Sequence, residues 1–110
     1  MKTQAKTKEG ARYRFRADDF WTLIKGQDYK CALTGRELTP ENTEVELRDP
    51  YLTKGRGEHA NLYLVIRPLA QMARYVSERD IVELAAEIIQ ARGAEFGYGI
   101  TKKKGRAKRG

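Results

Sequence analysis

The chain has 110 residues, which suits one small domain with a modest core and excludes a large multidomain architecture. Its single cysteine excludes an internal disulfide and a cysteine-rich zinc site. Charged residues make up 34% of the sequence, and no apolar run approaches the roughly 20 residues needed to span a bilayer, so we expect a cytoplasmic protein without membrane contact.

The formal net charge of +7 is concentrated at the two ends of the chain. Residues 1–16 and residues 93–110 each carry six Lys or Arg side chains against one glutamate, whereas residues 17–92 carry 10 basic and 13 acidic side chains. We therefore expect a basic N-terminal arm, a slightly acidic domain and a flexible basic C-terminal tail. Basic segments attract polyanions such as nucleic acid, although tails that only confer solubility have the same composition.

Aromatic and basic residues alternate at the end of the N-terminal arm. Tyr13 and Phe15 lie between Arg12, Arg14 and Arg16, and this period of two allows a short edge strand. Arginines interleaved with aromatic rings also suit contact with phosphates and stacking on bases. Alternatively, the two rings only anchor the arm to the core.

The next segment is predicted to be a helix that runs to about Lys25. Asp18 or Asp19 can cap its N-terminus, and Gly26 marks its end. Phe20, Leu23 and Ile24 share one face of this helix, which we expect to pack in the core.

A knuckle-like turn, CALTG at residues 31–35, follows this helix. Zinc knuckles pair two cysteines across such a turn, but the second position here is Thr34 and the chain has no other cysteine. We therefore expect no structural zinc, and we predict that Cys31 is a small buried apolar residue.

Two short strands are predicted on either side of a polar loop that contains glycine. Val45-Glu46-Leu47 alternates between apolar and polar residues, and an apolar run ends at Ile66. Pro68 suits the first turn of a following helix. The apolar face of that helix would hold Leu69, Met72 and Ala73.

A final helix is predicted after Ser77, because residues 77–80 form a capping box with aspartate in place of the usual glutamate. Gly93 is expected to end it. Apolar residues repeat at helical spacing along it, so we predict a core helix. They are Ile81, Leu84, Ala85, Ile88 and Ile89. The aromatic residues Phe96 and Tyr98 then either fold back on the core or face a partner.

The order of these elements, the CALTG turn and the spacing from Pro50 to Asn61 resemble the core of HNH nucleases, and most of all the phage-type members. The resemblance covers roughly residues 18–92. It implies an α+β fold with a small ββα-metal-like core. An N-terminal helix would precede this core, and a C-terminal helix and the basic tail would follow it.

HNH nucleases use one divalent cation to stabilise the leaving oxygen and a histidine base to activate the attacking water. The resemblance aligns the metal-binding aspartate of the family with Glu46 and its orienting asparagine with Asn61. The general-base histidine aligns with Leu47, and the metal-binding histidine with Ile66. Aliphatic side chains can neither accept a proton nor bind a metal, so we expect no catalytic residue, metal or cofactor. Asn61 would instead bond backbone groups of the loop.

The leading interpretation is a non-catalytic HNH-fold protein, of phage origin and acting in the host cytoplasm. It would bind nucleic acid, with DNA favoured over RNA, or a host protein that processes nucleic acid. One alternative is an active DNA endonuclease with a rearranged site that uses Mg²⁺ or another divalent cation. The residues of that site would be Glu46, Asp49, His59 and Asn61. Another alternative is a protein–protein inhibitor of a nucleic-acid enzyme or a host defence complex. The oligomeric state is left open.

Thirteen basic side chains are candidate nucleic-acid contacts. Three lie in the N-terminal arm, four in or beside the predicted hairpin and six in the C-terminal tail. They are Arg12, Arg14, Arg16, Arg48, Lys54, Arg56, Arg67, Lys102, Lys103, Lys104, Arg106, Lys108 and Arg109.

Overall fold

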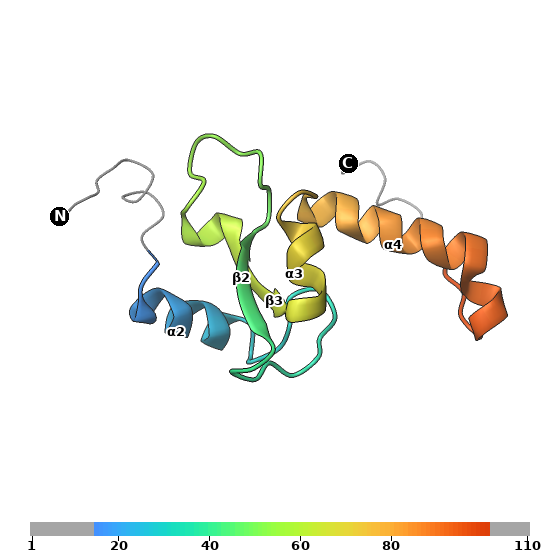
Figure 1. The fold of residues 1–110 in the computed structure, drawn as a ribbon, viewed down its shortest axis with the longest axis horizontal. Helices are drawn as coiled ribbons and strands as arrows, with labels where there is room; N and C mark the ends of the chain where they lie inside the picture. The colour runs from blue at the N-terminus through green and yellow to red at the C-terminus, as the bar shows by residue number, and fades with distance from the viewer. Residues whose placement is uncertain (1–14, 102–110) are drawn as a thin grey trace.

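The computed structural model describes residues 15–101 (Figure 1). A two-stranded antiparallel hairpin is followed by two helices and preceded by another, so the predicted α+β class is confirmed at this level. None of the helices in this part of the chain combines the length and apolarity needed to cross a bilayer. In chain order, the elements are α2 (Ala17–Gly26), β2 (Thr43–Leu47), the 3-10 turn η1 (His59–Asn61), β3 (Leu62–Ile66), α3 (Arg67–Ala73), α4 (Glu78–Arg92) and the 3-10 turn η2 (Gly93–Phe96).

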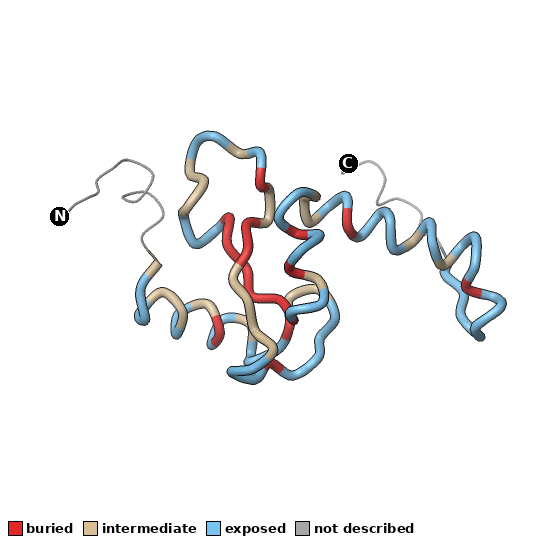
Figure 2. Tube along the Cα trace, in the orientation of Figure 1, coloured by how far each residue is buried: buried red, intermediate tan, exposed pale blue. Residues whose placement is uncertain are grey.

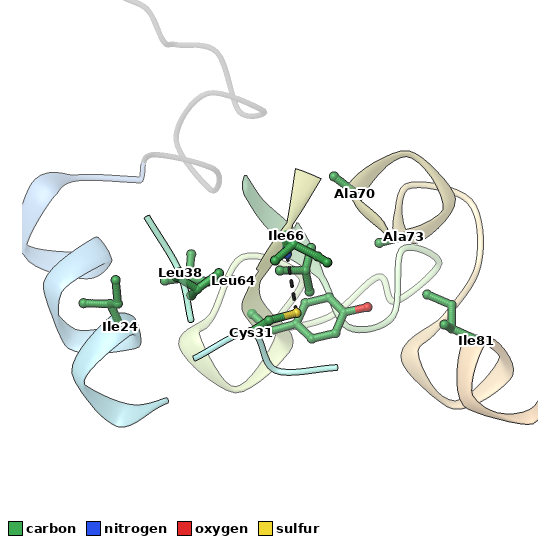
Figure 3. Packing of buried hydrophobic residues seen from close by; sticks show 10 residues of the cluster. Ile24, Cys31, Leu38, Leu64, Ile66, Ala70, Ala73 and Ile81 are labelled. Atoms are coloured by element: carbon green, nitrogen blue, oxygen red, sulfur yellow. Dashed lines mark hydrogen bonds between the residues drawn. The ribbon is translucent and has the colours of Figure 1, made fainter. Parts of the chain in front are cut away.

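The hairpin forms the centre of the domain. β2 and β3 pair from Thr43 opposite Ile66 to Leu47 opposite Leu62. Every residue of β3 is buried, because α2 packs against the strand on one side and α3 with the start of α4 covers it on the other (Figures 2 and 3). An apolar run without alternation is typical of a strand covered on both faces, and the sequence of β3 fits this environment.

The start of α2 differs from the prediction. The helix begins at Ala17, so Arg16 is the N-cap and neither Asp18 nor Asp19 occupies that position. Asp19 lies inside the first turn, where its Oδ2 accepts a hydrogen bond of 2.8 Å from the backbone N–H of Arg16. The carboxylate therefore stabilises the helix start from the third helical position, as in one half of a capping box. Of the edge strand predicted at residues 12–16, residues 15 and 16 are not in a strand, and residues 12–14 lie outside the described residues.

The segment between α2 and β2 closes the outer edge of β3. The Gln27 carboxamide accepts a hydrogen bond from the Leu64 N–H at 2.9 Å and donates one to the Leu64 carbonyl at 3.0 Å. The thiol of Cys31, buried as predicted, accepts bonds from the N–H groups of Thr34 and Ile66. Burial raises the pKa of the Cys31 thiol, but hydrogen bonds from the Thr34 side chain and from the backbone of Ile66, Thr34 and Leu33 outweigh it, so the net pKa is lowered.

The caps of α4 are confirmed, but its predicted place in the core is wrong beyond the first turn. The Ser77 hydroxyl accepts a hydrogen bond from the Asp80 N–H, and the helix ends at Gly93. Only Ile81 is buried, whereas Leu84 is 40% exposed and Ile88 is 57% exposed (Figure 2). The helix leaves the domain after its first turn (Figure 1), and along the rest of its length only the segment that follows it, from Gly93 to Tyr98, folds back near Ile89.

Small residues form the buried face of α3. Ala70 and Ala73 are buried against the hairpin, Leu69 is half-buried, and Met72 is exposed, contrary to its predicted place on the apolar face. Because alanine side chains are small, the backbone of α3 can lie close to β2 and β3. At the end of the helix, the long side chain of Arg74 reaches Glu46 in β2.

Tyr63 has a buried hydroxyl with no hydrogen-bond partner among the described residues. Burial raises its pKa to about 12. We expect Tyr63→Phe to leave the free energy of unfolding unchanged or to raise it by up to about 1 kcal/mol, because the variant removes an unsatisfied polar group and keeps the ring. Urea denaturation measures this difference. A loss above about 1 kcal/mol would mean that the hydroxyl is hydrogen-bonded in solution, for example to a buried water.

Candidate nucleic-acid interface

A cleft of about 400 Å³ opens between β2, the following loop and the end of α3. Two glutamates and two arginines give it a polar character, and apolar residues form the rest of its wall. It is lined by Glu44, Val45, Glu46, Leu47, Pro50, Arg56, Ala73 and Arg74. The position that the HNH resemblance assigns to a metal-binding carboxylate, Glu46, therefore lies in this cleft.

The Glu46 carboxylate is paired with a cation of the chain itself. Glu46 is 9% exposed, and its Oε2 lies 3.3 Å from Nε of Arg74. Burial raises the pKa of Glu46; the hydrogen bond and charge of Arg74 oppose this effect, and neighbouring Glu44 adds to it. Sequence reasoning missed Arg74, because the packing of α3 on the hairpin decides which side of this helix faces the sheet.

The two aliphatic residues at the predicted histidine positions are part of the packed interior. Leu47 is buried and pairs with Leu62 in the hairpin. Ile66 is buried at the end of β3, immediately before α3, and its N–H donates to Cys31. Both side chains thus contribute to stability, which gives each position a role that does not involve a metal ion.

Asn61 has the structural role that the sequence predicts for it. Its Oδ1 accepts a hydrogen bond of 3.0 Å from the Asp49 N–H, and its Nδ2 donates to the carbonyls of Asp49 at 3.3 Å and Arg56 at 2.9 Å. The side chain is buried. Asn61 therefore joins the two sides of the loop between the strands and fixes its path beside the cleft.

The side chains of the alternative catalytic site have separate partners and do not form one group. His59 Nε2 lies 2.7 Å from Oδ1 of Asp19 in α2, while Glu46 is bonded to Arg74, and Asp49 meets Asn61 through backbone groups. The Arg16 N–H, and to a smaller extent His59, lowers the pKa of Asp19. Between residues 15 and 101, no group of three or more His, Cys, Asp or Glu side chains is arranged to hold a metal ion.

Several of the predicted nucleic-acid contacts in the hairpin are engaged within the domain. Arg48 lies 2.7 Å from the Glu78 carboxylate, with its guanidinium also over the Tyr63 ring. Arg67 lies 3.0 Å from Glu44. These two arginines stabilise the packing of the helices on the hairpin, and their charges are largely compensated. Lys54 is exposed on the loop, and Arg16 is exposed at the start of α2. Arg56 lines the cleft. The other predicted contacts lie outside the described residues; they are Arg12, Arg14, Lys102, Lys103, Lys104, Arg106, Lys108 and Arg109.

Two exposed tyrosines lie next to the cleft. Tyr51 follows Pro50 and is 69% exposed, and Tyr75 follows Arg74 and is 67% exposed. The Tyr51 hydroxyl donates a hydrogen bond of 2.7 Å to the backbone carbonyl of Tyr75. This bond ties the loop to the end of α3. Both tyrosines directly follow residues that line the cleft, and we call this pair the tyrosine rim.

The burial of Glu46 leads to a prediction about the pH dependence of stability. Because the folded-state pKa of Glu46 is raised, the folded protein binds this proton before the unfolded chain does, so this group adds stability as pH falls through its folded-state pKa. We expect Glu46→Gln to lack this increase in stability at acidic pH. At neutral pH its free energy of unfolding should be at least as large as that of the parent. Urea denaturation of both proteins between neutral and mildly acidic pH measures the difference. A clear loss at neutral pH would mean that the ion pair with Arg74 is net stabilising.

No protein-family model, curated protein or solved structure matches the chain.

Proposed function

We propose that the protein is a non-catalytic nucleic-acid-binding protein with an HNH-like core. The observation that carries this proposal is the distribution of charge. Residues 15–101 carry 11 basic and 14 acidic side chains, whereas residues 1–14 carry five basic and one acidic, and residues 102–110 carry six basic and none acidic. A net charge of −3 on the domain beside +4 and +6 at its two ends supports binding of a polyanion through the ends.

The cleft supports the non-catalytic part of the proposal. The carboxylate that would hold a metal ion in the family is already neutralised by Arg74, and Leu47 and Ile66 are needed where they are for packing. The hairpin and helices would then serve to position the basic ends and to present the cleft. DNA is the favoured ligand on the resemblance to HNH nucleases, and a protein that processes nucleic acid is compatible with the same charges.

Deletion of residues 102–110 tests the role of the C-terminal segment. If about half of its six basic side chains contact phosphates, the deletion should lower the magnitude of the log–log salt slope on duplex DNA by about 2–3 and weaken binding to all sequences alike. Fluorescence anisotropy over a salt series measures this slope. A full-length variant with the same nine residues in scrambled order is the matched control and should keep the parent slope. Equal slopes for the deleted and full-length chains would exclude the segment from the interface.

A second candidate function is supported by α4, which exposes Leu84 and Ile88 beyond its first turn. An apolar helix face that the domain leaves uncovered suits a protein–protein inhibitor that docks on a nucleic-acid enzyme. The same titrations separate the two candidates. If the full-length chain binds neither DNA nor RNA at low salt, the nucleic-acid proposal fails and the inhibitor takes its place.

A further inference from the structure

Arg56 is a positive charge that backbone carbonyls hold in the cleft, without a carboxylate partner among residues 15–101. Its Nη1 donates to the backbone carbonyls of Pro50 at 2.5 Å and Leu52 at 3.4 Å. No Asp or Glu in residues 15–101 lies within ion-pair distance of this guanidinium. The other charges of the cleft cancel, because Glu44 pairs with Arg67 and Glu46 with Arg74. The cleft therefore contains one oriented, uncompensated guanidinium, which favours an anionic ligand.

Arg74 is a second guanidinium in the same cleft, and it already has an anionic partner. Its Nε contacts the buried Glu46 carboxylate, while the Arg74 side chain is half exposed to solvent. A phosphate oxygen and a carboxylate oxygen make equivalent hydrogen bonds to a guanidinium. An incoming phosphate would thus compete with Glu46 for Arg74 and meet Arg56 without competition.

The tyrosine rim indicates which phosphate-containing ligand fits. Tyr51 and Tyr75 expose large aromatic side chains next in the sequence to the cleft residues Pro50 and Arg74. The hydrogen bond from the Tyr51 hydroxyl to the Tyr75 carbonyl limits the freedom of the Tyr51 ring. Free phosphate or a lipid headgroup would leave these rings unused. Bases of a single strand can stack on them, whereas the bases of a duplex are already stacked on one another.

We propose that the cleft and the tyrosine rim form a subsite for single-stranded nucleic acid. Arg56 and Arg74 contact the phosphates, Tyr51 and Tyr75 stack on bases, and Glu46 competes internally for Arg74. The inference rests on the proposed nucleic-acid function and adds the ligand class and a site within the folded domain. It also gives Arg74 a role in binding, with Glu46 setting the strength of that binding.

A pair of variants with equal changes in charge tests the competition. Glu46→Gln removes the competitor. Glu83→Gln removes one negative charge from an exposed glutamate of α4 that pairs with Arg79 and does not line the cleft. Full-length variants are titrated by fluorescence anisotropy with a labelled oligothymidine and with a duplex of equal length. We expect Glu46→Gln to bind the single strand about threefold to tenfold more tightly than Glu83→Gln. Its salt slope should be greater in magnitude by about 0.7. The two variants should bind the duplex equally.

Tyr75→Ala tests the stacking independently, because it keeps the backbone carbonyl that Tyr51 contacts and changes only an exposed side chain. It should weaken binding to the single strand by about tenfold and leave duplex binding unchanged. If Tyr75→Ala binds like the parent and Glu46→Gln binds like Glu83→Gln while the parent still binds nucleic acid, the subsite is wrong and the proposed function stands. If neither the parent nor any variant binds either ligand, both are wrong.

Discussion

Replacement of Asn61 with alanine is expected to lower the free energy of unfolding by about 2–4 kcal/mol. The buried carboxamide makes three hydrogen bonds to backbone groups of Asp49 and Arg56, and alanine would leave these groups unsatisfied inside the loop. Each buried polar group that loses its partner costs about 1–3 kcal/mol, partly recovered where water can enter. Urea denaturation followed by circular dichroism measures the difference.

Asn61→Asp provides the control for this prediction. Aspartate has the same size and keeps the acceptor for the Asp49 N–H, but it cannot donate to the carbonyls of Asp49 and Arg56. We expect a loss at neutral pH that is comparable to that of alanine and becomes smaller as the new carboxyl is protonated. A loss below about 1 kcal/mol for both variants would contradict the loop-fixing role of Asn61.

Replacement of Ile81 with alanine is expected to cost about 2–4 kcal/mol, the usual range for removing a buried isoleucine side chain beyond its Cβ. Ile81 is the buried residue of α4 and belongs to the core cluster that includes Ala73 and Tyr63 (Figure 3). Its loss removes the buried apolar side chain through which α4 joins the core cluster. Chemical denaturation gives the stability, and the hydrogen exchange of the α4 amides reports whether the helix detaches locally.

Ile88→Ala is the matched variant, because it makes the same chemical change on the same helix at an exposed position. It should change stability by less than about 0.5 kcal/mol. If both variants cost the same, the outer half of α4 is covered in solution. A loss at Ile88 that grows with protein concentration would identify the cover as a second copy of the chain.

The elements with strong local signals could be predicted from the sequence. The serine cap and Gly93 fix the ends of α4, and Pro68 marks the first turn of α3. The alternation around Glu46 and the apolar run up to Ile66 locate the two strands of the hairpin. Each of these signals depends on the chemistry of a few neighbouring residues, so tertiary packing did not shift the helix ends or the strands from their predicted positions.

The features that the sequence did not predict depend on residues distant in the chain. The pairing of Glu46 with Arg74 and of Asp19 with His59 is set by the packing of α3 and α2 on the hairpin, and the ion pairs leave no local pattern. The exposure of Leu84 has a different cause. An amphipathic pattern shows that a helix has an apolar face, but it does not show whether the domain is large enough to cover that face.

The bonding of Gln27 to both backbone groups of Leu64 has a consequence for the solubility of the protein. LYLVI is a short apolar strand without charge, proline or glycine, which is the composition that recruits identical strands from other chains. In a two-stranded sheet its outer edge would be open to such pairing. Here the Gln27 side chain bonds both backbone groups of Leu64, the Ala32 N–H also donates to the Leu64 carbonyl, and the Cys31 thiol accepts from the Ile66 N–H. A short polar segment thus takes the place of a third strand. We therefore expect substitutions at Gln27 to cause aggregation through the outer edge of β3 before they affect the cleft.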